Sequence, residues 1–276
     1  MSILELKNLT IQYRGKFLVK NISLAIKKGE WFALIGESGS GKSVTASSIG
    51  ALLPDKLQVS EGEIIFQGKN MRTISNCDVR KMRGKNIAYV FQDYQNAFTP
   101  FIRIGKQMDE MIKCHESIEP QERKDMILNS LTEVGLDAER MFNSYPFQLS
   151  GGQLQRTAIA QATLLKPELL IADEPTTALD AVTAAKVLKL LADIKDKLHC
   201  TILFITHDLR CVKRFADRVA IMNAGEIVES GNKNEVLMNP QHPYTRELFA
   251  SVPPLRNVPE RLSVKNFREY VVAREG

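Results

Sequence analysis

The chain has 276 residues, enough for one large domain or two of average size. Hydrophobic residues make up 44% of it and charged residues 25%, a composition that is typical of globular proteins and excludes disorder for most of the chain. Lys and Arg outnumber Asp and Glu by 37 to 32, and this small excess gives no reason to expect nucleic acid as a partner. No apolar run approaches the roughly 18 residues of a membrane-spanning helix, and the N-terminus lacks the features of a signal peptide, so we expect a cytosolic chain.

The first part of the chain has the pattern of β-strands. Residues 3–10, 18–26 and 63–67 alternate or are rich in strand-forming side chains, and glycines separate them, which predicts an antiparallel sheet. Residues 31–35 form a continuous apolar run, as expected of a strand that is buried on both faces of a parallel sheet. A helix is expected from Ser43 onward.

The middle of the chain has a different pattern. Between residues 94 and 146 strand signals largely vanish, and Met, Glu, Lys and Leu dominate. Residues 154–160 also have a helical pattern. The sequence therefore predicts an inserted helical subdomain at about 94–160.

Strands and helices alternate again in the last part of the chain. Apolar runs at 169–172 and 202–205 predict two more buried parallel strands, with a helix between them that begins after Asp180 as N-cap. A strand pair is expected at 218–222 and 226–229, and the chain beyond Gly231 is expected to form a short helix and a proline-containing appendage outside the main sheet. The expected fold class is α/β, with a mixed sheet core, an antiparallel β subdomain, a helical insertion and a short C-terminal extension.

A phosphate-binding pattern lies between the first buried strand and the helix that follows it. Its residues are Gly36, Glu37, Ser38, Gly39, Ser40, Gly41, Lys42 and Ser43, which fit G-x-x-x-x-G-K-[ST]. In such a P-loop the backbone amides and the helix N-terminus bind phosphate oxygens, the lysine reaches the β and γ phosphates, and the serine hydroxyl is a ligand of Mg²⁺. The strand and helix on either side argue against a flexible surface loop, so the pattern predicts binding of ATP and Mg²⁺.

Two acids follow the buried strand at 169–172. The carboxyl ends of parallel strands meet at the edge of the sheet where ligands bind, so Asp173 and Glu174 are expected beside the P-loop. Asp173 suits the Mg²⁺ shell, usually through a water molecule. Glu174 is placed to orient or deprotonate the attacking water. Strands often end in an acid, so this pair is informative only together with the P-loop.

A third motif precedes the helical run at 154–160. Residues 149–153 read Leu-Ser-Gly-Gly-Gln, and Ser150, Gly151, Gly152 and Gln153 resemble the signature motif of ATP-binding cassette (ABC) ATPases. The pentapeptide occurs by chance in well under about one chain in a thousand, and no other kind of P-loop enzyme calls for it. The resemblance implies an ABC ATPase domain over residues 1–235.

Four further residues match marks of this family, in family order. Tyr13 matches the aromatic that stacks on adenine, and Gln92 matches the glutamine that senses Mg²⁺ and nucleotide. Asp180 lies in the match to the D-loop, and His207 matches the switch histidine. The resemblance therefore implies that Glu174 and His207 are catalytic and that Ser43, Gln92 and Asp173 surround the metal.

Each of these matches has a plainer alternative. Tyr13 could be a surface aromatic, Gln92 a polar residue at a strand end, and His207 a loop histidine. His207 nevertheless follows a buried strand that ends at the same edge as Glu174. A metal site is the remaining alternative, and the helix-strand-helix pattern argues against it because it spreads the candidate ligands over separate elements. Those candidates are His199, Cys200, His207 and Cys211.

The chain end indicates a branch of the family. Residues 240–248 resemble the segment after the last strand in ATPases of oligopeptide, dipeptide and nickel importers, which implies a C-terminal extension over residues 236–276. Two departures stand out. Tyr94 occupies a position where relatives often have proline, in a region that faces the membrane subunit in ABC importers. No cysteine follows Cys211, so we expect no iron-sulfur cluster of the kind that many relatives carry in this tail.

The resemblance implies an assembly. In the family the signature loop of one subunit faces the P-loop of another, so the expected partners are a homologous ATPase in a heterodimer, two transmembrane permeases and, through them, an extracellular substrate-binding protein. The implied function is ATP hydrolysis that powers import of peptides, nickel or metal-chelator complexes, by a peripheral subunit at the cytoplasmic face of the membrane.

Two other classes are less well supported. A soluble ABC ATPase of DNA repair or translation usually has a very long coiled-coil insertion or two cassettes in one chain. A P-loop kinase would not explain residues 149–153 or His207.

Overall fold

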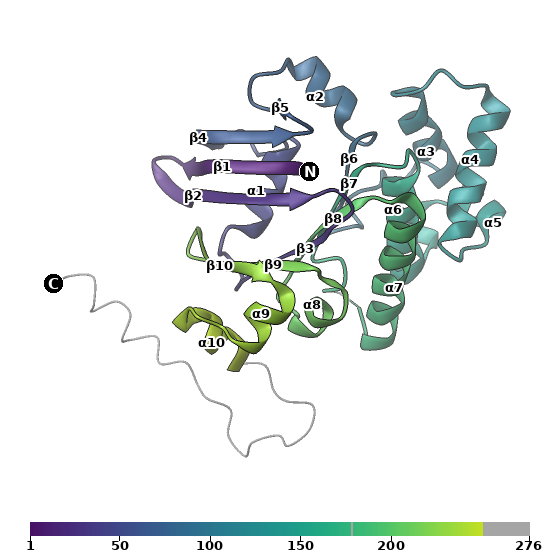
Figure 1. Cartoon of the computed structure of the whole chain (residues 1–276). Coiled ribbons are helices and arrows are strands. Elements are labelled where there is room, and N and C mark those ends of the chain that lie inside the picture. Colours follow the sequence, from purple (N-terminus) through teal and green to yellow (C-terminus); the bar gives the residue numbers. More distant parts are fainter. Residues whose placement is uncertain (178, 251–276) are drawn as a thin grey trace.

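The computed structural model describes residues 1–177 and 179–250, which form two β-sheets with helices packed around them (Figure 1). The strands are β1 (Ser2–Tyr13), β2 (Lys16–Lys27), β3 (Trp31–Ile35), β4 (Leu57–Phe66), β5 (Lys69–Asn70), β6 (Ile87–Val90), β7 (Leu169–Asp173), β8 (Thr201–Thr206), β9 (Arg218–Asn223) and β10 (Glu226–Asn232). The helices are α1 (Lys42–Ile49), α2 (Asn76–Met82), α3 (Ile104–Lys113), α4 (Pro120–Glu133), α5 (Ala138–Asn143), the 3-10 helix η1 (Pro146–Gln148), α6 (Gly151–Thr163), α7 (Ala181–Leu198), α8 (Leu209–Phe215), α9 (Lys233–Met238) and α10 (Pro243–Ala250).

The smaller sheet is antiparallel, as its alternating pattern predicted. Its strand order is β2-β1-β4-β5, and all its neighbouring strands run in opposite directions. One face of β1 is buried through Leu4, Leu6, Leu9 and Ile11. The sheet thus covers the core on one face, and its strands extend beyond the ranges that the pattern predicted.

The larger sheet contains the parallel strands. Its order is β10-β9-β3-β8-β7-β6, in which only the β10–β9 pair is antiparallel. All residues of β3 and β8 are buried. The parallel strands predicted from the continuous apolar runs are therefore confirmed, as is the strand pair at the end of the sheet that makes it mixed.

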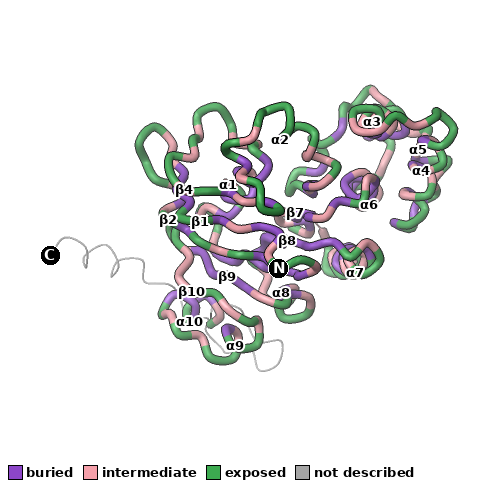
Figure 2. Tube along the Cα trace, turned by 45° about the horizontal axis from the view of Figure 1, so that its top comes forward, coloured by how far each residue is buried: buried purple, intermediate pink, exposed green. Residues whose placement is uncertain are grey.

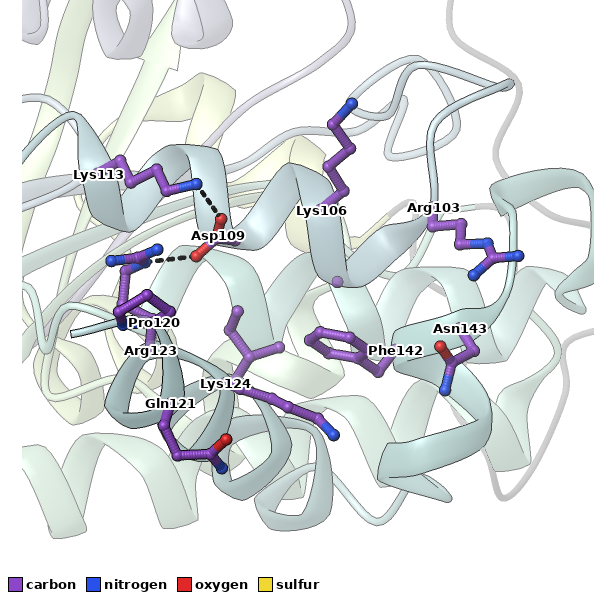
Figure 3. A pocket seen from close by; sticks show the side chains of 12 residues that line it. Arg103, Lys106, Asp109, Lys113, Pro120, Gln121, Arg123, Lys124, Phe142 and Asn143 are labelled. Atoms are coloured by element: carbon purple, nitrogen blue, oxygen red, sulfur yellow. Dashed lines mark hydrogen bonds and ion pairs between the residues drawn. The ribbon is translucent and has the colours of Figure 1, made fainter. Parts of the chain in front are cut away.

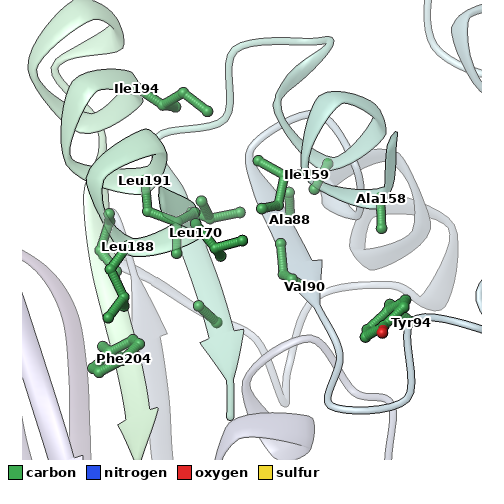
Figure 4. Packing of buried hydrophobic residues seen from close by; sticks show 14 of the residues in the cluster. Ala88, Val90, Tyr94, Ala158, Ile159, Leu170, Leu188, Leu191, Ile194 and Phe204 are labelled. Carbon is green, nitrogen blue, oxygen red and sulfur yellow. The ribbon is translucent and has the colours of Figure 1, made fainter. Parts of the chain in front are cut away.

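The larger sheet separates two hydrophobic cores. Trp31 and Ala33 of β3 belong to the core on one face, whereas Phe32 and Leu34 belong to the core on the other, because successive side chains of a strand point to opposite faces. On the first face α7 packs over the sheet, with its Leu188 and Leu191 beside Leu170 and Phe204 (Figure 4). On the second face lie the antiparallel sheet and α1, so the buried strands run through the middle of the molecule (Figure 2).

The helical insertion predicted from the sequence is present. Residues 91–168 are all described and contain α3 to α6 with no strand. The helices α3, α4 and α5 project to one side of the two sheets (Figure 1). Met108 and Met141 are buried among them as core residues, and the exact limits of the subdomain stay a prediction.

The last described elements, α9 and α10, follow β10. They lie outside the sheet, as expected. They dock on it through Val236, Tyr244 and Leu248, which are buried in the first hydrophobic core. The part of the predicted extension beyond residue 250 lies outside the described residues. No helix in the described part of the chain is long and apolar enough to cross a membrane.

Candidate nucleotide-binding site

The structure brings the main predicted site residues to one edge of the larger sheet. The P-loop follows β3, Asp173 ends β7 and Glu174 comes next, and His207 follows β8. Because β3, β8 and β7 are parallel neighbours, their carboxyl ends lie side by side. Residues that are far apart in the sequence are thus placed within contact of one another.

Two glycines allow the P-loop to pass close to other strands. A Cβ atom on Gly36 would overlap the backbone carbonyl oxygen of Met222 in β9, and one on Gly41 would lie 2.9 Å from the carbonyl oxygen of Leu18 in β2. Gly41 also has a φ of 108°, a left-handed conformation that favours glycine. Both positions therefore require glycine. Of the residues between them, Ser38 and Gly39 are exposed, Glu37 is half-buried and Ser40 is buried.

Lys42 is buried inside the loop. Its Nζ donates hydrogen bonds to the carbonyl oxygens of Gly36 at 2.9 Å and Glu37 at 2.8 Å, and to Ser40 Oγ at 3.4 Å. Burial lowers the pKa of this ammonium group, and the nearby charges of Glu174 and Asp173 partly offset that effect. The cation is thus held where the loop would bind phosphate oxygens.

Ser43 and Asp173 form a pair of oxygen donors. The Ser43 hydroxyl donates to Asp173 Oδ1 at 3.1 Å. Burial raises the pKa of Asp173, as does the charge of Glu174, while the hydrogen bond from Ser43 and the charge of Lys42 act in the opposite direction. A hydroxyl and a carboxylate at hydrogen-bond distance are the ligand types that Mg²⁺ prefers, so this donor set fits the ion.

Glu174 and His207 form a second pair. His207 Nδ1 lies 3.3 Å from Glu174 Oε1, with 14% of the Glu174 side chain exposed against 58% for His207. The Glu174 backbone is in the left-handed region, with φ of 45°, and its amide donates to the carbonyl oxygen of Ile205 at 2.9 Å. A non-glycine residue in this conformation is strained, which is common at functional sites. The backbone conformation of Glu174 and the hydrogen bond of its amide to Ile205 therefore place its carboxylate against His207.

One residue of this cluster escaped sequence reasoning. The Thr177 hydroxyl donates to Glu174 Oε2 at 2.8 Å, so each carboxylate oxygen has its own partner. The only sequence signal was a hydroxyl three residues after an acid at a strand end, and such spacing is common in turns.

The signature residues lie at the start of α6. Ser150 is its N-cap, and it exchanges hydrogen bonds with Gln153 in a capping box, since Ser150 Oγ accepts from the Gln153 amide and Gln153 Oε1 accepts from the Ser150 amide. Ser150 and Gly151 are exposed. The motif thus builds an exposed helix N-terminus, a local structure that favours negatively charged groups.

The three remaining candidates are Tyr13, Gln92 and Asp180, and the contacts described for them are with nearby residues of the chain. Tyr13 ends β1 and is half-buried, with the guanidinium of Arg14 5.5 Å from its ring centroid. Gln92 follows β6 and is exposed. Asp180 is the N-cap of α7, as predicted. The hydrogen bond from the Thr183 side chain, followed by that from the Thr183 amide, lowers the pKa of its carboxyl. Roles of these three in nucleotide binding stay predictions.

The alternative metal site does not assemble. In the described ranges 1–177 and 179–250, no three or more His, Cys, Asp or Glu side chains are grouped so as to hold a metal ion. Cys200 is buried at the start of β8, and burial raises the pKa of its thiol to about 11.

A hollow in the helical region is separate from the P-loop. It lies between α3, α4 and α5 and has basic side chains around it (Figure 3). Asp109 at its rim pairs with Lys113 at 2.6 Å and with Arg123. None of residues 36–43 lines it, so it is not the nucleotide site.

Comparison with known families agrees with this geometry. The family model described as "ABC transporter" matches residues 19–177, and the model "Oligopeptide/dipeptide transporter, C-terminal region" matches residues 228–270. The chain belongs to the ABC transporter family. It is an ATP-binding protein and ATPase of this family, in its oligopeptide/dipeptide branch.

Several ABC transporter proteins are similar over most of this chain. The "Metal-staphylopine import system ATP-binding protein CntD" of Staphylococcus aureus (strain NCTC 8325 / PS 47) is 44% identical over 254 residues, 91% of this chain and 93% of that protein. The "Dipeptide transport ATP-binding protein DppD" of Lactococcus lactis subsp. cremoris (strain MG1363) is 41% identical over 94% of this chain and 76% of that protein. The "Oligopeptide transport ATP-binding protein OppD" of Bacillus subtilis (strain 168) is 42% identical over 92% of this chain and 73% of that protein.

Solved ABC structures have the same fold. A "dimeric structure of a post-hydrolysis state of the ATP-binding cassette MJ0796 bound to ADP and Pi" superimposes with a TM-score of 0.74 at 31% identity, over 83% of this chain and 98% of that one. The structure of cbiO1 from Clostridium perfringens, part of the ABC transporter complex cbiONQ, gives a TM-score of 0.75 at 29% identity, over 86% and 91% of the two chains. The ABC ATPase fold with its antiparallel β subdomain is therefore established for this chain.

Proposed function

We propose that this ABC transporter ATPase binds ATP with Mg²⁺ at residues 36–43 and hydrolyses it with Glu174 as the general base. The observation that carries the proposal is the convergence of two pairs, Ser43 with Asp173 and Glu174 with His207, beside the buried Lys42. The first pair and the lysine suit a triphosphate and its metal ion, and the second suits an attacking water.

Each side chain has a separate task in this proposal. The P-loop amides and Lys42 hold the phosphates, and Ser43 and Asp173 hold Mg²⁺, directly or through water. Held there, the ion would supply positive charge against the phosphate oxygens. Glu174 accepts a proton from the attacking water. The water oxygen bonds to the γ-phosphorus while the bond between the γ-phosphorus and the β-phosphate oxygen breaks, which yields ADP and phosphate. His207 and Thr177 orient the carboxylate, and Gln92 contacts the ion and nucleotide.

The proposal includes a partner ATPase. The signature motif forms a helix N-terminus that suits a γ-phosphate held by a second, homologous subunit, with Ser150 and Gly151 exposed and Gly152 and Gln153 half-buried. We propose a heterodimer in which each signature motif covers the other subunit's P-loop, with Asp180 near the shared interface and Tyr13 stacked on adenine. The similarity to a cassette whose solved structure is dimeric supports this arrangement.

We further propose that the dimer powers import at the cytoplasmic face of the membrane. The names of the relatives support peptides or metal-staphylopine complexes as cargo. Nickel as a further cargo rests only on the resemblance of residues 240–248 to the nickel importers. Two permeases and an extracellular binding protein would complete the transporter. Purification of the tagged chain from membranes tests this part, because recovery without any permease would contradict it.

Replacement of Glu174 tests the catalytic part. Glu174→Gln should retain ATP binding but slow turnover by about 10²- to 10⁴-fold, the usual effect of losing a general base. The matched control is Glu168→Gln, the same substitution immediately before β7, at the opposite end of that strand. ATP binding is measured by calorimetry and turnover by phosphate release from the assembled transporter. Near-normal turnover in Glu174→Gln would remove Glu174 from this role.

A further inference from the structure

One residue of the C-terminal segment contacts the P-loop directly. Tyr244 in α10 accepts a hydrogen bond on its phenolic oxygen from the backbone amide of Glu37, at 3.2 Å. The two residues are 207 positions apart in the sequence. The tyrosine is buried in the first hydrophobic core. Burial raises the pKa of its phenol, so the group stays neutral at physiological pH. The contact joins α10 to the beginning of the P-loop.

The backbone carbonyl of the same residue, Glu37, binds Lys42. The carbonyl oxygen of Glu37 accepts the 2.8 Å hydrogen bond from Lys42 Nζ. Tyr244 therefore holds the amide of a residue whose carbonyl oxygen helps to place the phosphate-binding cation. A shift of this backbone segment would change the position of Lys42, because the interior of the loop is closely packed.

A network from β10 positions Tyr244. The Glu229 carboxylate accepts hydrogen bonds from the amides of Gln241 at 2.8 Å and His242 at 3.1 Å. His242 Nδ1 in turn accepts from the Tyr244 amide at 3.2 Å. Burial acts to raise the pKa of Glu229, but the hydrogen bonds from the Gln241 amide, the Thr245 side chain and the His242 amide, with the charge of His242, outweigh it and hold the pKa below its ordinary value. The start of α10 is thus tied to the sheet, which keeps the phenol aimed at the P-loop.

We propose that Tyr244 is a positioning residue of the nucleotide site, so that residues 240–248 belong functionally to the P-loop of this chain. The proposal rests on the proposed binding of ATP at residues 36–43. Tyr244 does not touch the reacting atoms; it acts by holding the Glu37 amide and, through the Glu37 carbonyl, Lys42. Loss of this hydrogen bond weakens ATP binding and leaves the chemical step unchanged.

The test is Tyr244→Phe, which removes the hydroxyl and keeps the ring in the core. We expect ATP to bind about twofold to tenfold more weakly, the usual effect of one lost hydrogen bond, with a raised KM for ATP and an unchanged kcat. Amide hydrogen exchange at Glu37 should become faster, and the change should be confined to the P-loop. A general loss of core packing would instead speed up exchange in many parts of the chain. The matched control is Tyr145→Phe in the helical region, which should leave ATP affinity, KM, kcat and exchange at Glu37 unchanged.

A second variant tests the network. Glu229→Gln should shift ATP affinity in the same direction, and the double variant with Tyr244→Phe should bind ATP no more weakly than Tyr244→Phe alone, because both act through one contact. Additive losses, or a Tyr244→Phe protein with unchanged ATP affinity and unchanged exchange at Glu37, would overturn the inference. Failure of the wild-type chain to bind ATP would instead overturn the proposed function, so the two failures are distinguishable.

Discussion

Glu174 shows how single residues build the site. It has a left-handed backbone, and its two carboxylate oxygens are held by Thr177 and His207. The strain in such a backbone is tolerated where surrounding contacts determine the conformation. Here the amide of Glu174 is bound to the neighbouring strand, so the side chain is aimed before any substrate binds.

The cysteines provide a test of residue environment. Cys77 and Cys114 are exposed, whereas burial raises the pKa of Cys200 to about 11 and that of Cys211 to about 12. The thiolate is the reactive form, so at pH 8 we expect Cys77 and Cys114 to react with a maleimide much faster than the other two. Mass spectrometry of labelled peptides measures the order.

The same shifts predict a pH dependence. An acid whose pKa is higher in the folded chain than in the unfolded one stabilises folding less as pH rises through the interval between the two values. For Cys200 this interval runs from the ordinary 9.0 to about 11. The Cys200→Ser variant should therefore lose less stability than the wild-type chain between these pH values in chemical denaturation. An equal loss in both proteins would contradict the burial argument.

At the scale of elements, α6 connects the signature motif to its surroundings. Its Gln155 is buried and donates a side-chain hydrogen bond to the carbonyl oxygen of Pro175, next to Glu174. A Cβ atom on Gly151 would lie 3.2 Å from the Tyr94 hydroxyl. The helix is thus packed between the loop after β7 and the segment after β6.

Tyr94 occupies the position where the family often has proline, and the structure gives it a packing role. Its side chain is 5% exposed and belongs to the main core beside α6 (Figure 4). Tyr94→Ala should lower the free energy of unfolding by about 3–5 kcal/mol, as expected when a buried aromatic is truncated. The control Phe147→Ala removes an aromatic that is 64% exposed and should cost far less. Similar losses in the two denaturation curves would show that Tyr94 does not stabilise the fold.

At the scale of the whole molecule, the P-loop edge and the signature motif are, in the proposed function, complementary parts of a site shared between two subunits. The P-loop edge lies at the carboxyl ends of β3, β7 and β8, and the signature motif is an exposed helix N-terminus. A sandwich of two ATPases would unite the parts, and ATP would stabilise the closed state only while it contacts both subunits. In the proposed dimer, hydrolysis would remove that contact and so couple the ATPase cycle to opening of the sandwich.

Ser150→Asp tests the signature motif in this assembly. Aspartate is as good an N-cap as serine, so α6 should remain folded. Its charge would face the partner's γ-phosphate, and like charges near a protein surface repel by about 1–4 kcal/mol. We expect the ATPase rate of the two-subunit assembly to fall about tenfold or more, with ATP affinity of the isolated chain unchanged.

The matched control for this variant is Ser75→Asp, the same change at the exposed N-cap of α2. It should leave the rate of the assembly unchanged. A normal rate in Ser150→Asp would exclude the signature motif from the partner's site.

The sequence by itself determined most of the elements and pointed to the candidate site residues. Buried strands such as Trp31–Ile35, the N-cap Asp180 and the P-loop glycines depend on local patterns, because periodicity, capping and φ values are properties of a few consecutive residues. The acids after β7 were likewise visible as a strand end.

Only the tertiary structure decided which of these residues meet. The contacts of Ser43 with Asp173, Glu174 with His207 and Glu37 with Tyr244 join residues that lie far apart in the chain. They depend on the strand order β9-β3-β8-β7 and on the docking of α10. Local patterns do not specify strand order or helix docking, since both follow from how buried surfaces pack in three dimensions. For that reason the contact of Tyr244 with the P-loop became visible only in the folded chain. Thr177 was missed for a different reason, because its hydroxyl lies only three residues after Glu174 and such spacing is common in turns.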